Sequence, residues 1–443
     1  MSGTMIGMIG FTGLLGLLAV RIHIGIAMFI AGAAIYLAVN TWEPAGLLFT
    51  LNNLVYARLS NYDLAVIPLF ILMGQFATHG GLSKALFRAA GTLIGHWRGG
   101  LAMASTAACA AFGAICGSSL ATAATMGQVA LPELRAHGYS GKLATATLAA
   151  SGTLGILIPP SVPLVIYAVL TQESIGKLFV AAVIPGILAA LGYLLVIRIM
   201  VTRDPSAGPA GERASLGTML RAQLGILPVL MVFLVVIVGI YGGWANPTEA
   251  ASIGAAACGI IAAVSGGMKT KDFVQSVYGT AHATAMIFVV LLGADLLNAS
   301  LALSQLPVEL ANWVKDSGFE PMLVLLAILL IYLVLGCVMD SLAMILLTIP
   351  IFYPVIMGLD FYGMPDSDKS IWFGIVALMV VEIGLVTPPV GMNLYVINKL
   401  ARDVPLKETA SGVLCFLASD LLRIALLIFV PGISLWLVHA TGG

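Results

Sequence analysis

The most regular feature of the chain is a series of long apolar stretches separated by short polar connections. Each simple stretch approaches the roughly 20 residues that an α-helix needs to cross a bilayer. These stretches lie at 5–20, 23–39, 64–78, 178–200, 223–241, 248–266, 281–301 and 412–438. The pattern predicts an all-α polytopic membrane protein.

Two apolar runs, 99–134 and 321–357, are each about twice the length of one span and are interrupted midway. Small polar clusters make the interruptions, Gly117-Ser118-Ser119 in the first run and Met339-Asp340-Ser341 in the second. Each run therefore predicts a re-entrant helical hairpin, because irregular backbone at membrane depth is tolerated only where it is buried in protein or lines a cavity. Two pairs of ordinary short spans remain the alternative.

Two further runs, 143–170 and 371–398, are each broken by a double proline. The first break lies in the segment GILIPPS that begins at Gly155, and the second in GLVTPPV, which begins at Gly384. The SLA triplet at the first hairpin tip also recurs at the second. Hairpin and broken helix thus occur twice in the same order, which predicts an internal repeat.

A polar stretch rich in Pro, Gly and Ser at 202–222 divides the chain nearly in half. We expect a first repeat at 1–201, with scaffold helices, an arm helix, the hairpin 99–134 and the broken helix 143–170. The stretch 202–222 is then a cytoplasmic linker. The second repeat occupies 223–443, with the hairpin 321–357 and the broken helix 371–398.

The charges of the connections predict the orientation of the two halves. Under the positive-inside rule, basic connections are cytoplasmic. Basic residues gather at 79–98, 135–142, 198–221, 267–272 and 399–407, whereas the connections at 309–320 and 358–368 are acidic. The first hairpin then opens to the cytoplasm and the second to the outside. The repeats are predicted to be inverted, as in many secondary transporters.

Composition agrees with the membrane assignment and excludes other classes. The chain has 443 residues, of which 60% are hydrophobic and 9% charged, with a net charge of zero. A soluble domain carries about 25% charged residues, and a nucleic-acid-binding protein carries a basic patch that is not seen here. The five cysteines lack CxxC spacing, and no nucleotide-binding or metalloprotease motif occurs. We expect no enzyme activity, no organic cofactor and no metal other than a coupling cation.

The two helix breaks of each half are the candidate ion sites, because broken helices expose carbonyl oxygens that bind a hard cation. Hydroxyl groups at the same places add neutral oxygen ligands for sodium. The alternative is that these small residues serve only helix packing. The predicted sodium ligands are Ser118, Ser119, Thr122, Gly155, Ile158 and Ser161 in the first half, and Asp340, Ser341, Gly384, Thr387 and Val390 in the second.

Ionisable residues inside apolar segments are functional candidates by default. Asp340 is the strongest of them because it lies at a hairpin tip, whereas Asp295 and Glu382 allow a structural or a functional role equally. Asp420 and Arg423 are three residues apart and are expected to pair on one helix face.

Two amphipathic stretches, 45–58 and 82–96, alternate apolar and polar residues at helical spacing. They are predicted to lie in the membrane interface as arms of a scaffold, or else to be ordinary loop helices.

Together, the segment AICGSSLAT from Ala114, the segment GILIPPS from Gly155 and the segment GLVTPPVGMN from Gly384 resemble one family over essentially the whole chain. That family is the large membrane subunit of tripartite ATP-independent periplasmic (TRAP) transporters. The resemblance implies a sodium-driven importer of the bacterial inner membrane with an elevator mechanism. Its family sodium sites would fall on the hairpin tips and double-proline loops, and Val390 would contribute only a backbone carbonyl.

The resemblance also implies two partners and a substrate class. The partners are a soluble extracytoplasmic substrate-binding protein and a small four-helix membrane subunit, which we expect to be a separate polypeptide because this chain lacks extra N-terminal spans. The substrates are small organic anions, mainly carboxylates and some sulfonates. Loops expected to border the substrate contain Gly117, Pro159, Pro160, Pro388, Pro389, Gly391 and Asn393. The alternative function is a stand-alone ion-coupled anion symporter that needs no binding protein.

The predicted topology can be tested with single cysteines. A cysteine at Ser317 should react with a membrane-impermeant maleimide added to intact cells, because the acidic connection 309–320 is expected outside. A cysteine at Ser206 should react only after permeabilisation. Labelling of both cysteines from the same side would contradict the inverted arrangement.

Overall fold

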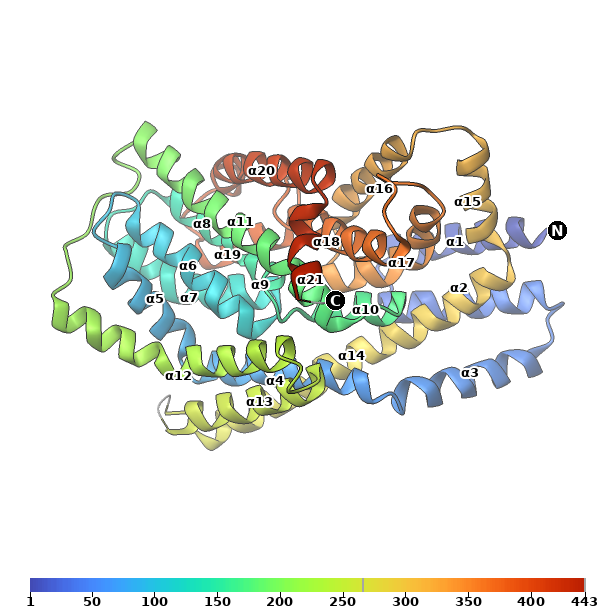
Figure 1. Ribbon diagram of the computed structural model, residues 1–443, viewed down its shortest axis with the longest axis horizontal. Helices are drawn as coiled ribbons and strands as arrows, with labels where there is room; N and C mark the ends of the chain where they lie inside the picture. The colour runs from blue at the N-terminus through green and yellow to red at the C-terminus, as the bar shows by residue number, and fades with distance from the viewer. Residues whose placement is uncertain (265–266, 442–443) are drawn as a thin grey trace.

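The computed structural model describes residues 1–264 and 267–441, and within these ranges the chain consists of helices joined by turns and short connections, without strands. Figure 1 shows the helices stacked along one long axis, with the N-terminus at one end. The last two residues of the predicted span 248–266 and of the predicted repeat 223–443 lie outside the described residues.

The first half of the chain forms eleven α-helices and one short 3-10 helix within the described residues. They are α1 (Gly3–Ala19), α2 (Ile24–Val39), α3 (Pro44–Leu59), η1 (Tyr62–Ala65), α4 (Val66–His79), α5 (Leu82–Ile94), α6 (Gly100–Cys116), α7 (Ser119–Ala136), α8 (Gly141–Gly152), α9 (Leu154–Leu157), α10 (Val162–Thr171) and α11 (Ile175–Arg203).

The second half contains ten helices over its described residues. They are α12 (Leu216–Tyr241), α13 (Pro247–Val264), α14 (Thr270–Leu303), α15 (Leu306–Asp316), α16 (Pro321–Gly336), α17 (Ser341–Met357), α18 (Asp366–Gly384), α19 (Met392–Leu400), α20 (Leu406–Phe429) and α21 (Gly432–Ala440).

The prediction of an all-α protein with membrane-spanning helices is confirmed. Over the described residues, five helices (α11, α12, α13, α14 and α20) are long and apolar enough to cross a bilayer. Two bent pairs pass the same criterion, α3 with α4 at 58° and α8–α9 with α10 at 42°. The interruptions in both long runs also occur, between α6 and α7 and between α16 and α17. The inverted orientation of the halves stays a prediction.

Three boundaries differ from the sequence-based expectation. The linker is only 204–215, because α11 and α12 continue into its basic ends. Part of the acidic connection 309–320 is helical, since Pro307 lies in the first turn of α15 and apolar residues follow at helical spacing. The span predicted at 412–438 is two helices, and the break falls at Pro431, which has no amide hydrogen to continue α20.

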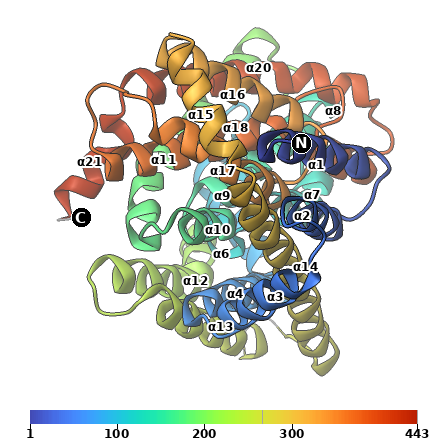
Figure 2. The same cartoon turned by 90° about the vertical axis from the view of Figure 1, so that its right-hand side faces the viewer.

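Small residues allow α2 and α14 to pack with their backbones in contact. A methyl group at Gly32 would lie 2.8 Å from the Leu297 amide nitrogen, and the Ser300 hydroxyl donates to the Gly32 carbonyl at 2.7 Å. Such close approach stabilises helix pairs in lipid, where apolar contact alone gives little preference. The two helices run side by side in Figures 1 and 2, with α3, α4, α12 and α13 along the same lower edge.

The broken and hairpin helices of both halves interlock at the centre of the fold, where α8 contacts α19 and α20, and α10 contacts α17. A glycine pair makes an equivalent close contact in each half. A methyl group at Gly113 would lie 2.3 Å from Gly155 Cα, and one at Gly384 would lie 2.5 Å from Gly336 Cα. Each pair brings the first helix of a hairpin against the broken helix of the same half.

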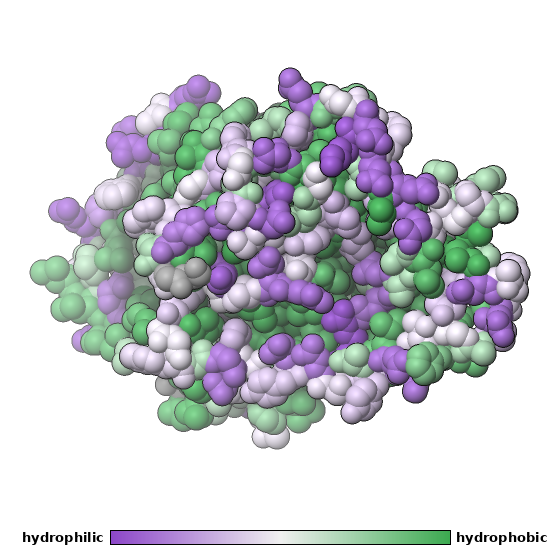
Figure 3. Space-filling view, turned by 45° about the vertical axis from the view of Figure 1, so that its right-hand side comes forward, coloured by the Kyte–Doolittle hydropathy of each residue, from purple (hydrophilic) through white to green (hydrophobic). Residues whose placement is uncertain are grey.

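The surface is largely apolar, as a lipid-facing protein requires. Figure 3 shows apolar residues exposed over much of the visible face among polar ones, with a recess near its middle. α12 presents a row of exposed leucines at helical spacing, which are Leu216, Leu220, Leu224 and Leu227. These side chains are available to lipid or to another membrane protein.

The close helix contact at Gly113 gives a stability prediction. Gly113→Ala should destabilise the fold by about 1–3 kcal/mol, because the added methyl group overlaps Gly155 in a packed core. The control is Gly225→Ala, where a methyl group meets nothing within 4 Å and alanine favours the helix. Thermal unfolding in detergent should show a lower melting temperature for Gly113→Ala alone. Equal melting temperatures would contradict the packing argument.

Candidate functional site

The two hairpin tips have matching local structure. Gly117 turns the first hairpin with a φ of 63°, in the left-handed region that favours glycine. Ser118 then caps α7, and its hydroxyl accepts a hydrogen bond from the Ala121 amide at 3.4 Å. Asp340 holds the same position before α17, where its carboxylate accepts from the Ala343 amide at 3.5 Å. Each tip therefore begins a helix whose first amides favour a negative charge.

The double prolines lie in the breaks of the two bent helices. In the first half, 158–161 separates α9 from α10, and in the second, 385–391 separates α18 from α19. The Pro159–Pro160 and Pro388–Pro389 bonds are both cis. Proline has no amide hydrogen, so carbonyl groups before each break lose their usual helical partner. These carbonyls are the neutral oxygens expected of an ion site.

Oxygen atoms converge on Gly155 in the first half. A methyl group there would lie 2.4 Å from Thr122 Oγ1 and 2.8 Å from the Ser118 carbonyl oxygen. Within the described residues, the buried hydroxyls of Thr122 and Ser161 lack hydrogen-bond partners. An unpaired buried hydroxyl costs about 1–3 kcal/mol. This oxygen set, made of neutral hard ligands, fits the chemistry of a sodium ion, and Ile158 ends α9 beside the break.

The second half offers a different oxygen set. Gly391 has a φ of 58°. A methyl group added there would lie 3.2 Å from the carbonyl oxygens of both Leu385 and Thr387. The Thr387 hydroxyl donates to the Ile383 carbonyl at 2.7 Å and so keeps only its lone pairs for a ligand. Gly384 faces the backbone of Gly336, not hydroxyl oxygens. The side chains and carbonyl groups around the two breaks therefore differ between the halves, and sodium binding at either place stays a prediction.

Glu382 joins the two hairpin tips. Its carboxylate, on α18, accepts hydrogen bonds from the hydroxyls of Ser119 and Ser341, the first residues of α7 and α17; the Ser341 bond is 2.9 Å long. All three side chains are buried. The helix N-termini of both hairpins thus meet at one acidic group.

A cavity of about 210 Å³ opens beside this junction. Predicted residues Gly117, Ser118, Ser119, Asp340 and Ser341 line it from the two tips. Cys116, Leu120, Ala121 and Leu342 beside the tips also line it. The walls from α4, α9, α10 and α14 were not predicted from the sequence; they are Ile71, Gly74, Gln75, Thr78, Ile156, Val162, Pro163, Ala283 and Ile287. Gln75 and Thr78, polar residues within the predicted span 64–78, are the only sequence features that could have drawn attention to the α4 wall.

The other predicted loop residues lie away from this cavity lining. The four prolines remain in the helix breaks. Asn393 is fully buried, and its side-chain nitrogen donates to the Ala149 carbonyl at 3.3 Å. Asn393 therefore ties the second broken helix to α8 of the first half. Val390 lies at the end of the second break, next to Gly391.

The other intramembrane charges have structural partners. Asp295 pairs with Arg58 from the last turn of α3, a helix in which Leu47 is the one buried residue and which is therefore not clearly amphipathic as predicted. The expected pair of Asp420 and Arg423 is confirmed at 2.9 Å, and Tyr193 donates to Asp420 at 2.9 Å. These charges hold α3 against α14 and α11 against α20.

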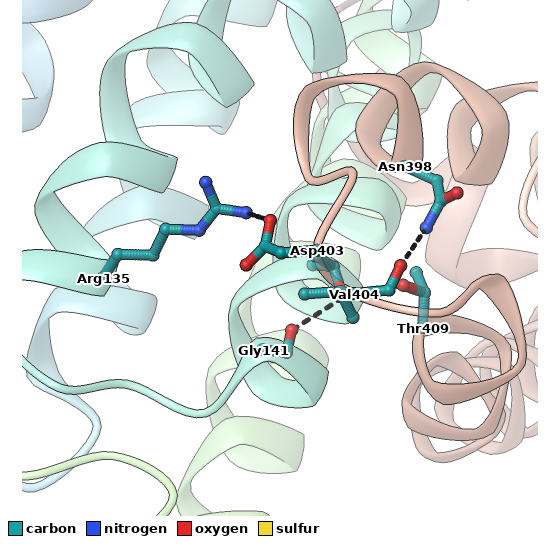
Figure 4. A network of polar contacts seen from close by, with 7 residues as sticks. Arg135, Gly141, Asn398, Asp403, Val404 and Thr409 are labelled. Carbon is teal, nitrogen blue, oxygen red and sulfur yellow. Dashed lines mark hydrogen bonds and ion pairs between the residues drawn. The ribbon is translucent and has the colours of Figure 1, made fainter.

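A second set of contacts joins the halves at the far ends of the same helices. Arg135 at the end of α7 pairs with Asp403, in the connection between α19 and α20 (Figure 4). In that connection the Val404 carbonyl accepts from the Asn398 amide at 2.7 Å. Val404 also packs on Gly141, where a methyl group would lie 2.6 Å from it. The helix α7 of the first hairpin is therefore joined to the second half at both of its ends, through Glu382 near the tip and through Asp403 at the other end.

Comparison with known proteins places this architecture in one family. The family model described as "Tripartite ATP-independent periplasmic transporter, DctM component" matches residues 11–433. The C4-dicarboxylate TRAP transporter large permease protein DctM of Pseudomonas aeruginosa is 36% identical over 383 residues, which cover 86% of this chain and 87% of that protein. The sialic acid TRAP transporter large permease protein SiaM of Vibrio cholerae is 31% identical and covers 96% of both chains.

A solved structure and a further relative extend the comparison. The Alcanivorax borkumensis YdaH transporter is similar in fold, with a TM-score of 0.60 over 90% of both chains at 16% identity. The isethionate TRAP transporter permease protein DctMQ of Oleidesulfovibrio alaskensis is 31% identical over 87% of this chain and 59% of that protein. The expected family resemblance is therefore confirmed, and this chain belongs to the large permease subunits of the TRAP transporters, which are multi-pass membrane transport proteins.

Proposed function

We propose that the chain imports small organic anions across the bacterial inner membrane by sodium symport. The observation that supports this most directly is the meeting of both hairpin tips at a small cavity. The first amides of α7 and α17 attract a carboxylate or sulfonate group there. The names of the relatives, which concern a C4-dicarboxylate, sialic acid and isethionate, agree with an anionic substrate.

Sodium is the proposed driving ion because oxygens gather at both helix breaks. The oxygen set at Gly155, which includes the unpaired Thr122 hydroxyl, suits a cation that binds neutral oxygens. Family membership and the absence of a nucleotide-binding motif from the sequence both favour an ion gradient over ATP. Binding of sodium would organise the tip that also borders the substrate cavity.

The proposed transport movement is of the elevator type. The cavity lies between the hairpin tips on one side and α4 and α14 on the other. We assign α2 and α14, whose backbones are in close contact, and α4, which packs against α14, to a fixed scaffold. The hairpins and broken helices, joined by Glu382, Asn393 and the Arg135–Asp403 pair, are suited to move as one unit.

Two partners complete the proposed transporter. A separate small four-helix membrane subunit would cover the exposed apolar residues of α3 and α12. The subunit would thereby widen the scaffold in the membrane plane. α3 exposes Leu48, Phe49 and Tyr56. A soluble extracytoplasmic binding protein would deliver substrate to the outer face.

The sodium proposal predicts the effect of one isosteric change. Thr122→Val removes the unpaired hydroxyl at Gly155 and should raise the sodium concentration for half-maximal uptake by about tenfold, because a ligand is lost at nearly constant volume. The matched control is Thr147→Val, which removes another buried unpaired hydroxyl from the uninterrupted helix α8 and should leave sodium dependence unchanged. Uptake that proceeds equally with potassium and a proton gradient would refute the sodium proposal.

The partner proposal predicts the outcome of reconstitution. Proteoliposomes with this chain alone should not accumulate substrate. Addition of a small four-helix membrane subunit and a substrate-loaded binding protein should restore uptake. Robust accumulation by the chain alone would favour the stand-alone symporter.

A further inference from the structure

Glu382 contacts both candidate ion sites through a serine in each half. Its two carboxylate oxygens are both used: Oε2 accepts from Ser119 and Oε1 accepts from Ser341 at 2.9 Å. These serines lie 263 and 41 residues away from it in the chain. One rigid, planar group therefore sets the orientation of a hydroxyl in each half of the protein.

No cationic side chain competes for this carboxylate. Each of the five ion pairs found in the described residues uses a different acid, namely Asp295, Asp403, Asp366, Asp420 or Asp368. The donors to Glu382 are the neutral hydroxyls of Ser119 and Ser341, and all three side chains are buried. Its carboxyl group therefore faces the two serine hydroxyls and has no arginine or lysine partner among the described residues.

The first half has no second carboxylate in the corresponding position. Glu382 lies two residues before Gly384, and the residue two before Gly155 is Thr153. The Thr153 hydroxyl bonds with Tyr193, 3.0 Å away, and not with a hairpin tip. A single acidic group therefore serves both tips, although the surrounding backbone is repeated.

A hydroxyl that donates its hydrogen to a carboxylate presents its lone pairs to a cation. Carboxylates behind metal ligands act in this way: they fix ligand orientation and raise the electron density on the ligand atom. Because Glu382 stands behind both Ser119 and Ser341, it improves both as sodium ligands. It is a positioning residue and need not contact sodium itself.

We propose that Glu382 couples the two sodium sites, so that occupation of one increases the affinity of the other. This inference rests on the proposed sodium symport. A sodium ion at the first site fixes the Glu382 carboxylate, and the carboxylate then holds the serine hydroxyl of the second site in place. The second ion therefore binds a hydroxyl that is already oriented and does not lose affinity to the entropy cost of ordering it. Sodium binding to the full chain is therefore cooperative, and the cooperativity depends on Glu382.

The test measures sodium binding through thermal unfolding of the full-length chain in detergent, with choline replacing sodium to keep ionic strength constant. Sodium should raise the melting temperature of the unmodified chain with a Hill coefficient above 1. Glu382→Gln replaces one carboxylate oxygen with an NH₂ group. This group donates a hydrogen bond to a serine hydroxyl and so competes with sodium for a lone pair of that hydroxyl. The Hill coefficient should fall to about 1, and the midpoint should rise by about 10-fold or more, as for loss of a group behind a metal ligand.

A matched control separates coupling from loss of stability. Thr348→Val removes a buried hydroxyl from α17 that contacts Tyr332 instead of Glu382. It should lower the melting temperature without changing the Hill coefficient. Glu382→Asp, whose shorter side chain cannot reach both tips, should behave as Glu382→Gln.

The outcomes distinguish this inference from the proposed function. If sodium does not stabilise the unmodified chain, sodium symport fails and the coupling fails with it. If sodium stabilises the chain but Glu382→Gln keeps the same midpoint and Hill coefficient, only the coupling is overturned. Should Glu382→Gln not fold, Ser119→Ala, Ser341→Ala and their combination supply the test. If the sites are coupled, either single serine variant should lose most of the stabilisation by sodium. If they are independent, the loss in the double variant should equal the sum of the losses in the two single variants.

Discussion

Backbone groups without helical partners are the constraint on which this structure depends. A helix that breaks inside a bilayer leaves amides and carbonyls that lipid cannot satisfy. The chain breaks helices at two hairpin tips and two double prolines; the breaks of the first half are largely buried, whereas Val338 and Pro389 in the breaks of the second half are exposed. Caps from Ser118 and Asp340 satisfy part of this requirement. The carbonyls that remain are the groups that suit a cation.

Burial of the breaks requires close approach between helices, and glycine provides it. The Gly113–Gly155 and Gly336–Gly384 contacts leave no space for a side chain between a hairpin and its broken helix. The same requirement explains why oxygen atoms surround Gly155, since a methyl group there would displace them. Packing and ion chemistry thus depend on the same small residues, which makes it hard to change one without the other.

The two halves share a backbone plan but divide the polar chemistry unequally. The first half contributes unpaired hydroxyls at Thr122 and Ser161, whereas the second contributes converging carbonyls near Gly391 and the carboxylate of Glu382, which contacts both tips. Each half contains a hairpin tip and a double-proline break, but the side chains around them differ. The Arg135–Asp403 pair and Asn393 then hold the unequal halves together.

The sequence by itself determined the class of protein, the order of its main spans and the positions of the two interrupted runs and the two double-proline breaks. These features depend on local chemistry: apolar length sets a span, and proline or glycine interrupts it whatever lies nearby. Only the tertiary structure decided that Glu382 bonds to Ser119 and Ser341, because that contact joins segments up to 263 residues apart. The same holds for the cavity wall from α4 and α14, whose residues carry no motif. Side chains meet through the packing of distant helices, and no local pattern encodes that packing.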